Sequence, residues 1–269
     1  MADPLSRVRE QPRELLDNIA ASMNARAAEP AMQVICARYM TNLSLPSNAR
    51  VLEVGCGNGA TTKLIMQNIN FTELVAIDPC SVFIEMARES LAGDGRISFA
   101  LGEAGDTGQE DASFDLVIAH TVYSHLPDPE QALAEARRVL RPLGQLVIFD
   151  GDFATLTVAL FDGDPLQATV PAVLRHWVHA PYIMRRLSAL VTAARFSLQS
   201  VEPHGYVQTT SPDYLLTLLS RGTQAAGRAG EIDRELVDGF DREARRRVAN
   251  GTFYGAMLFV SLTGRKNGE

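Results

Sequence analysis

Hydrophobic positions alternate between strand and helix periods over the first 150 residues. The pattern predicts strands at 50–54, 73–77, 96–101, 115–119 and 144–149, with helices at 60–68, 81–91 and 129–140. Residues 1–49 are predicted to be helical, because Leu15, Ile19 and Met23 recur at helical spacing. Strands that alternate with helices favour a parallel sheet with right-handed crossovers. The chain is therefore predicted to belong to the α/β class.

The alternation stops after Asp150. Residues 151–182 contain several prolines and no clear strand, and the later pattern predicts a helix at 183–194, a strand at 196–202, two helices within 211–248 and a final strand at 253–263. We interpret the chain as one domain with additions. Its predicted parts are an N-terminal helical cap (1–49), an α/β core (50–150), a lid insertion with a helix (151–195) and a C-terminal part (196–269) with a helical insertion at 205–250.

A glycine-rich turn follows the first predicted strand. The segment VLEVGCGNG places Gly55, Gly57 and Gly59 between that strand and a helix, a pattern that brings backbone N–H groups close to a ligand. The same glycines also satisfy the dinucleotide fingerprint. Glu53 at the strand end disfavours a pyrophosphate and favours a sulfonium or an amino group. Asp78, at the end of the second strand, suits the ribose of a dinucleotide as well as that of a sulfonium ligand, so it does not distinguish the two.

Between residues 48 and 151 the sequence resembles the class I S-adenosylmethionine methyltransferases, especially the branch that resembles ubiquinone and menaquinone biosynthesis enzymes. The motifs that carry the resemblance are, in order, VLEVGCGNGATT, LVAIDPCSVFIEMAR, the pair Glu103-Ala104, SFDLVIAHTVYSHLPDP and EARRVLRPLGQLVIFD. The resemblance implies a Rossmann-like sheet of seven strands whose last strand is antiparallel and inserted near the edge.

The resemblance also implies a cofactor, S-adenosyl-L-methionine, and residues that bind it. The methionine part falls to Glu53, Gly55, Cys56, Gly57 and Gly59, the ribose to Asp78, and the adenine to Pro79, Glu103 and Ala104, with His120 near the methyl group. The sequence departs from the family pattern at 105–109, which reads GDTGQ where Leu-Pro-Phe is usual, so the adenine wall is expected to differ there.

Methyl transfer needs an aligned acceptor more than a nucleophile on the protein. A general base helps when the acceptor bears a proton, and histidine suits this work at neutral pH. The candidate bases are His125, His176 and His179, and the candidate acceptor walls are Tyr123, Trp177 and Tyr182. The segment 151–182, where these side chains are densest, is predicted to form a lid that selects the acceptor. No metal site is predicted.

Two absences narrow the acceptor. The fourth strand ends in AHTV and not in the Asn/Asp-Pro-Pro-Tyr motif of enzymes that methylate exocyclic amines, and no Asp-rich metal site is apparent. We therefore expect metal-independent methylation of O, N or C on a small, partly apolar metabolite. A non-methylating use of the cofactor, such as a cyclisation, and a cofactor-binding regulatory protein are the alternatives; an NAD-dependent oxidoreductase is disfavoured by Glu53 and the later motifs.

Composition limits the partners. The formal net charge of -7 argues against a nucleic-acid partner. The basic cluster Arg242, Arg245, Arg246 and Arg247 is interpreted as a solvated face near a helix end. The three cysteines, Cys36, Cys56 and Cys80, are too few for a disulfide framework. With no secretory pattern and no membrane-spanning run, the sequence predicts a cytoplasmic protein without membrane insertion, and it leaves a homodimer open.

Overall fold

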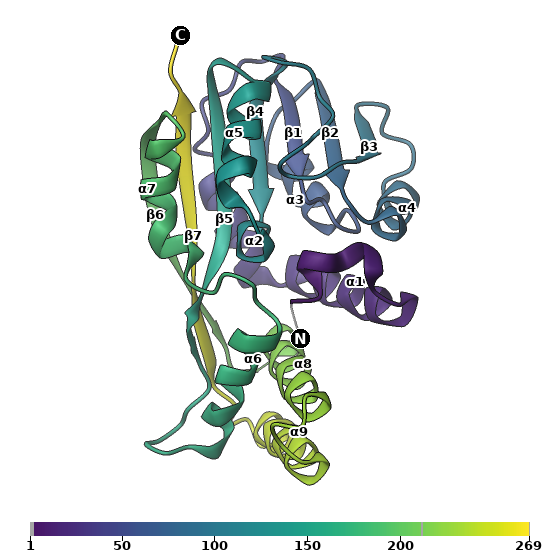
Figure 1. Cartoon of the computed structure of the whole chain (residues 1–269), viewed down its shortest axis with the longest axis vertical. Coiled ribbons are helices and arrows are strands. Elements are labelled where there is room, and N and C mark those ends of the chain that lie inside the picture. Colours follow the sequence, from purple (N-terminus) through teal and green to yellow (C-terminus); the bar gives the residue numbers. More distant parts are fainter. Residues whose placement is uncertain (1–2, 211, 269) are drawn as a thin grey trace.

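The computed structural model describes residues 3–210 and 212–268, which form a seven-stranded sheet flanked by helices (Figure 1). The strand order is β3-β2-β1-β4-β5-β7-β6. The strands are β1 (Arg50–Val54), β2 (Glu73–Asp78), β3 (Ile97–Leu101), β4 (Phe114–His120), β5 (Leu140–Thr157), β6 (Phe196–Gln208) and β7 (Gly255–Lys266). Strands β1 to β5 pair in parallel, and β7 runs antiparallel to both β5 and β6. The predicted fold class is confirmed.

Each face of the sheet buries its own hydrophobic core, because successive strand residues point to opposite faces. On β1, Val51 packs into one core with apolar residues of α1 to α4, whereas Leu52 and Val54 pack into the other with α5 and α7. These helices are α1 (Arg13–Ala28), α2 (Pro30–Met40), α3 (Ala60–Asn68), α4 (Ser81–Ser90), α5 (Pro129–Val139) and α7 (Ile183–Ala193). None of the helices within the described residues has the length and hydropathy needed to cross a bilayer.

Strands β5 and β6 continue well past the ends that the sequence pattern predicted. The prediction that 151–182 lacks a strand is wrong for its first seven residues, since β5 reaches Thr157 and β6 reaches Gln208. Both extensions pair with β7, which gives their backbone groups hydrogen-bond partners beyond the rest of the sheet. Beside them lie η3 (Pro165–Thr169), α6 (Val170–His176), α8 (Asp213–Arg228) and α9 (Arg234–Ala249) (Figure 1).

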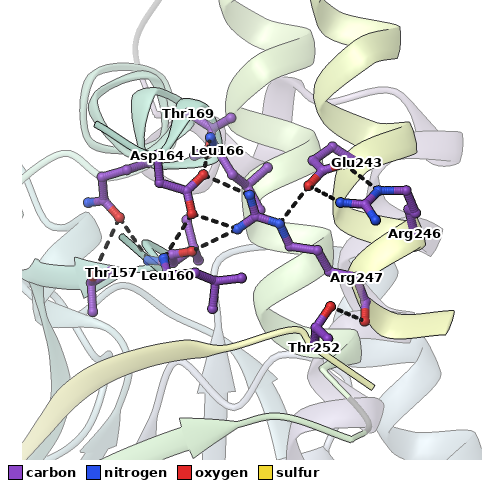
Figure 2. A network of polar contacts seen from close by, with 11 residues as sticks. Thr157, Leu160, Asp164, Leu166, Thr169, Glu243, Arg246, Arg247 and Thr252 are labelled. Atoms are coloured by element: carbon purple, nitrogen blue, oxygen red, sulfur yellow. Dashed lines mark hydrogen bonds and ion pairs between the residues drawn. The ribbon is translucent and has the colours of Figure 1, made fainter. Parts of the chain in front are cut away.

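A buried ion pair joins α9 to the turn before η3 (Figure 2). Both terminal nitrogens of Arg247 donate to the carboxylate of Asp164 at 2.7 Å, and the Arg247 Nε donates to Glu243 at 2.8 Å. Asp164 also accepts the backbone N–H groups of Leu160 and Leu166. The hydrogen bonds from Arg247 lower the pKa of Asp164 to about 2. The pair thus fixes α9 to the turn before η3, which follows the extended end of β5.

This pair corrects the interpretation of the basic cluster. Arg242, Arg245 and Arg246 are exposed, as expected, but only 3% of Arg247 is accessible to solvent. Helical spacing explains the difference, because Arg247 lies on the same face as the buried Ala244 and the partly buried Phe240.

Replacing Arg247 by alanine should destabilise the fold strongly, because it leaves the Asp164 carboxylate buried without its partner. Breaking a buried pair costs about 3–5 kcal/mol, which equilibrium unfolding in urea would measure. Arg246→Ala is the matched control, since Arg246 also pairs with Glu243 on the same helix but is exposed, and its unfolding midpoint should hardly move. Equal losses in the two variants would contradict a structural role for the buried pair.

Candidate functional site

The glycine turn requires backbone conformations that other residues rarely adopt. Gly55, Gly57 and Gly59 have φ values of 71°, 53° and 82°, in the left-handed region where a Cβ is disfavoured. A Cβ on Gly55 would also lie 2.5 Å from the Cγ2 of Val122. The turn therefore brings bare backbone to the carboxyl ends of β1 and β4, where ligands bind in open α/β sheets.

Asp78 ties this turn to the end of β2. Its carboxylate accepts the N–H of Gly57 at 2.9 Å and the N–H of Cys80 at 2.8 Å. Burial raises the pKa of Asp78 to about 6, although both backbone hydrogen bonds act in the opposite direction. Asp78 thus shapes the glycine turn as well as lying at the cavity described below.

Glu53 is a buried carboxyl group with one oxygen left unpaired. Its Oε2 accepts a hydrogen bond from the Thr62 hydroxyl at 2.6 Å, whereas Oε1 has no partner among the described residues. Burial, with a smaller contribution from the Asp78 charge, raises the pKa of Glu53 to about 8, although the hydrogen bond from Thr62 acts in the opposite direction. Unpaired buried acceptors are rare in folded proteins, so Oε1 is suited to a donor that the chain itself does not supply.

A first cavity of about 330 Å³ opens beside the glycine turn. Five of the predicted cofactor residues line it, namely Gly55, Asp78, Pro79, Glu103 and Ala104. The other five, Glu53, Cys56, Gly57, Gly59 and His120, are not among its lining residues. The cavity therefore lies over the ends of β1, β2 and β3, and Glu53 is buried without lining it.

The stretch that departs from the family pattern follows Glu103 and Ala104, and its first residue, Gly105, also lines this cavity. Glu103 and Asp106 exchange two backbone hydrogen bonds, at 3.0 and 3.1 Å, and so form a tight turn. Glu135 of α5 accepts hydrogen bonds from both the N–H and the hydroxyl of Thr107. The altered sequence at 105–109 therefore still gives an ordered wall.

An N-terminal segment, which we call the strap (residues 3–10), covers the first cavity. It contains the short 3-10 helix η1 (Leu5–Glu10), and all six residues of η1 line the cavity. At one end of the strap, the buried Asp3 carboxylate contacts the His125 Nδ1 at 2.6 Å and accepts the N–H of His179 at 3.0 Å. At the other end, Arg9 donates to the Pro79 carbonyl and pairs with Glu103. The sequence predicted the lid elsewhere, in 151–182.

His125 ends the short 3-10 helix η2 (Tyr123–His125), just beyond β4. Burial alone would lower its pKa, but the charge and hydrogen bond of Asp3, together with the charge of Asp150, raise it above the ordinary value of 6.5. Asp150 also fixes η2 in place, because its carboxylate accepts both the N–H and the hydroxyl of Ser124 at 2.9 Å. Within the described residues, the His125 Nε2 makes no hydrogen bond.

A second, smaller cavity of about 60 Å³ adjoins the first. Both cavities are lined by Leu5, Met23, Thr121 and His125. Thr121 has a φ of 56°, which is rare for a β-branched residue and marks local strain. The remaining walls of the second cavity come from α1, β5, α6 and α8, and include Phe153 and Trp177. A ligand in each cavity would meet the other at Thr121 and His125.

The other predicted acceptor and catalytic residues lie away from both cavities. His120 is buried, contacts the Tyr39 hydroxyl through Nδ1 and stacks on Phe149. His176 contacts Glu231 through Nε2. The side chains of His179 and Tyr182 are exposed, and Tyr123 is buried in the core. Only His125 and Trp177, of the six candidate acceptor and catalytic residues, line the second cavity.

Sequence reasoning missed Asp3, Asp150, Arg26 and Arg221. Asp150 carried a signal, because it directly follows the fifth apolar strand at the carboxyl edge of the sheet. No sequence signal marked Asp3, because its contacts with His125 and His179 span more than 120 positions of the chain. The two arginines lie on amphipathic helices, where an arginine that faces a cavity has the same sequence pattern as one that faces water.

Comparisons with known proteins agree with this geometry. Residues 52–148 match the methyltransferase domain family. A 37.1 kDa protein in transposon TN4556 of Streptomyces fradiae is 30% identical over 88% of this chain, and a 27-O-demethylrifamycin SV methyltransferase of Amycolatopsis mediterranei is 33% identical over 46%. The chain spans 61% and 46% of the lengths of these two relatives.

The fold also matches a solved structure. A protein from Bacillus halodurans that is described as a methyltransferase superposes with a TM-score of 0.62 at 20% identity, over 86% of this chain and 98% of that one. The sheet order, the glycine turn and the matched domain lead to one conclusion. Residues 52–148 form a methyltransferase domain, and the chain has the fold of the class I S-adenosylmethionine-dependent methyltransferases.

Proposed function

We propose that this chain transfers a methyl group from S-adenosyl-L-methionine to an O, N or C atom of a small, partly apolar molecule. The observation that carries the proposal is the pair of adjoining cavities, which share the wall formed by Thr121 and His125. Such a wall sets two ligands side by side, as direct transfer between them needs. The rifamycin relative, whose name describes methylation of an oxygen, supports a small-molecule acceptor.

The residues at the first cavity support binding of the cofactor there, because they offer both polar and apolar contacts. The bare backbone at Gly55 allows a close approach, and the unpaired Glu53 Oε1 suits a cationic amino group or an N–H donor. Asp78, at the end of β2, is positioned for ribose hydroxyls, while Pro79 and Ala104 give an apolar boundary beside Glu103. We assign these residues to cofactor binding.

In this proposal the chain binds the cofactor and the acceptor, orients them toward each other and excludes water from between them. When bound, the cofactor supplies an electrophilic methyl group with a thioether leaving group. The strap closes over the first cavity, and apolar residues such as Leu5 and Met23 keep water from the junction. His125 accepts the proton of the acceptor at Nε2, and Asp3 is a positioning residue that holds the imidazole through Nδ1. His176 and His179 take no part in proton transfer.

A direct test is label transfer into a metabolite extract. The protein is incubated with S-adenosylmethionine that carries a labelled methyl group, and the products are separated by mass spectrometry. Labelled small molecules that form with the active protein, and not with the His125→Gln variant, are expected. Binding of S-adenosylmethionine without any labelled product would contradict the proposed activity and would favour a non-methylating use of the site.

Glu53 should make cofactor affinity depend on pH. A carboxyl with a pKa of about 8 is protonated in the free protein at neutral pH, whereas a cationic amino group favours the ionised form. Binding should therefore release a proton, and affinity for S-adenosylhomocysteine should rise up to about tenfold per pH unit between about pH 6.5 and 8, then level off. Calorimetry in two buffers of different ionisation enthalpy measures both the affinity and the proton release.

Glu53→Gln is the variant that isolates this effect. It keeps the size and the hydrogen bond to Thr62 but cannot ionise, so its affinity should vary little above pH 7. Asp78, whose pKa is about 6, contributes only at the acidic end of the range. A wild-type affinity that stays flat from about pH 7 to 8, or a Glu53→Gln variant with the wild-type slope, would remove Glu53 from the cofactor site.

Asp3 should control the protonation of His125. The raised pKa of His125 depends on the Asp3 charge and hydrogen bond, so Asp3→Asn should lower that pKa, as followed by NMR titration of the histidine rings with His125→Gln for assignment. The rate of acceptor methylation should rise with pH through the same ionisation, because the base must be neutral. In Asp3→Asn this pH profile should move to lower pH.

His179→Ala serves as the control for Asp3→Asn. Only the backbone N–H of His179 contacts Asp3, so removal of its exposed side chain should leave the pKa of His125 and the pH profile unchanged. If Asp3→Asn lowers turnover without any shift of the profile, then Asp3 acts on the strap alone, and the pairing with His125 has no part in proton transfer.

A further inference from the structure

The second cavity combines an apolar surface with two arginines and no acid. Its apolar and aromatic lining includes Ile19, Met23, Phe153, Trp177 and Leu218, and its cations are Arg26 and Arg221. No carboxylate among the described residues lies within ion-pair distance of either arginine. Two uncompensated guanidinium groups at a cavity are unexpected in a chain with a net charge of -7.

Arg221 is fixed in place and stripped of much of its water. Its Nη2 donates to the Asn18 carbonyl at 2.6 Å and to the Ser22 hydroxyl at 2.7 Å, so it joins α8 to α1. Its guanidinium also lies over the Trp177 ring, 5.1 Å from the centroid. Burial lowers the pKa of Arg221 to about 10 because no carboxylate offsets the lost hydration. Its Nε and Nη1 make no hydrogen bond with the described residues.

Arg26 brings a second positive charge to the junction of the two cavities. Its Nη2 donates to the Thr121 hydroxyl at 2.8 Å, and its guanidinium lies 5.4 Å from the centre of the Tyr214 ring. Arg26 lines the second cavity but not the first. Stacking and hydrogen bonding hold both guanidinium groups before any ligand arrives, which suits planar recognition of carboxylate or phosphate.

We propose that the second cavity binds an acceptor with an anionic group, a carboxylate or a phosphate, which Arg26 and Arg221 hold while an apolar or aromatic body packs against Phe153 and Trp177. This assignment rests on the proposed function, since it names the chemical class of its acceptor. Each ligand oxygen that faces an arginine would gain a charge-assisted hydrogen bond.

The test uses simple acids in place of the unidentified acceptor. The full chain is saturated with S-adenosylhomocysteine and titrated by calorimetry with trans-cinnamate, with phenyl phosphate and with trans-cinnamamide, which has the same body as the first but no charge. At least one acid should bind about tenfold or more tightly than the amide. Arg221→Gln and Arg26→Gln should each weaken that acid by about tenfold to a hundredfold and leave the affinity for S-adenosylhomocysteine unchanged.

Arg242→Gln is the matched control, because it removes the same charge from an exposed position on α9, and acid binding should persist. Arg221→Lys, which keeps the charge but loses the planar group, should weaken the acid less than Arg221→Gln. The proposal is overturned if neither acid binds, if the amide binds as well, if Arg242→Gln has an equal effect, or if either cavity variant loses S-adenosylhomocysteine instead. Failure of the wild type to bind S-adenosylhomocysteine would contradict the proposed function itself. The experiment therefore distinguishes failure of the anion site from failure of the proposed function.

Discussion

Strand β7 supplies hydrogen-bond partners to β6 along nearly its whole length and to β5 from Gln145 to Asp152 and again at Thr157. Backbone N–H and C=O groups that leave a sheet without partners destabilise it, so β5 and β6 extend past the rest of the sheet only because β7 accompanies them. The extension of β5 and β6 also helps to form the second cavity. It places Phe153 at the second cavity and anchors the α6–α8 layer that contributes Trp177 and Arg221 (Figure 1).

Local pattern was sufficient for the α/β core between residues 50 and 140. The strands and helices between residues 50 and 140 follow the hydrophobic period, and β1 and α3 have the predicted ends. The glycine turn and Asp78 were found because strand–turn–helix geometry fixes their position from sequence alone. The later strands were predicted too short, because the extensions depend on pairing with β7, about a hundred residues further along from β5.

The strap and the second cavity depend on contacts that no local pattern records. The strap contains a short 3-10 segment that is kinked at Arg7 and has few apolar residues. Its Asp3 and Arg9 hold it in place through polar contacts with distant segments. His176 and His179 were candidates because aromatic residues are dense around them, but only Trp177 of that group turns toward the cavity. Arg247 could have been recognised, since its position repeats the spacing of Phe240 and Ala244 on the buried face of α9.

Leu5 has a consequence for the order of events in a catalytic cycle. Its side chain lines both cavities, and the strap that carries it is fastened at both of its ends. In the proposed function, displacement of the strap would therefore uncover both cavities at once. In enzymes with such a gate, the rate of opening often limits turnover. In the proposed cycle, turnover would then be limited by how fast the short, kinked η1 segment detaches, and not by the transfer of the methyl group.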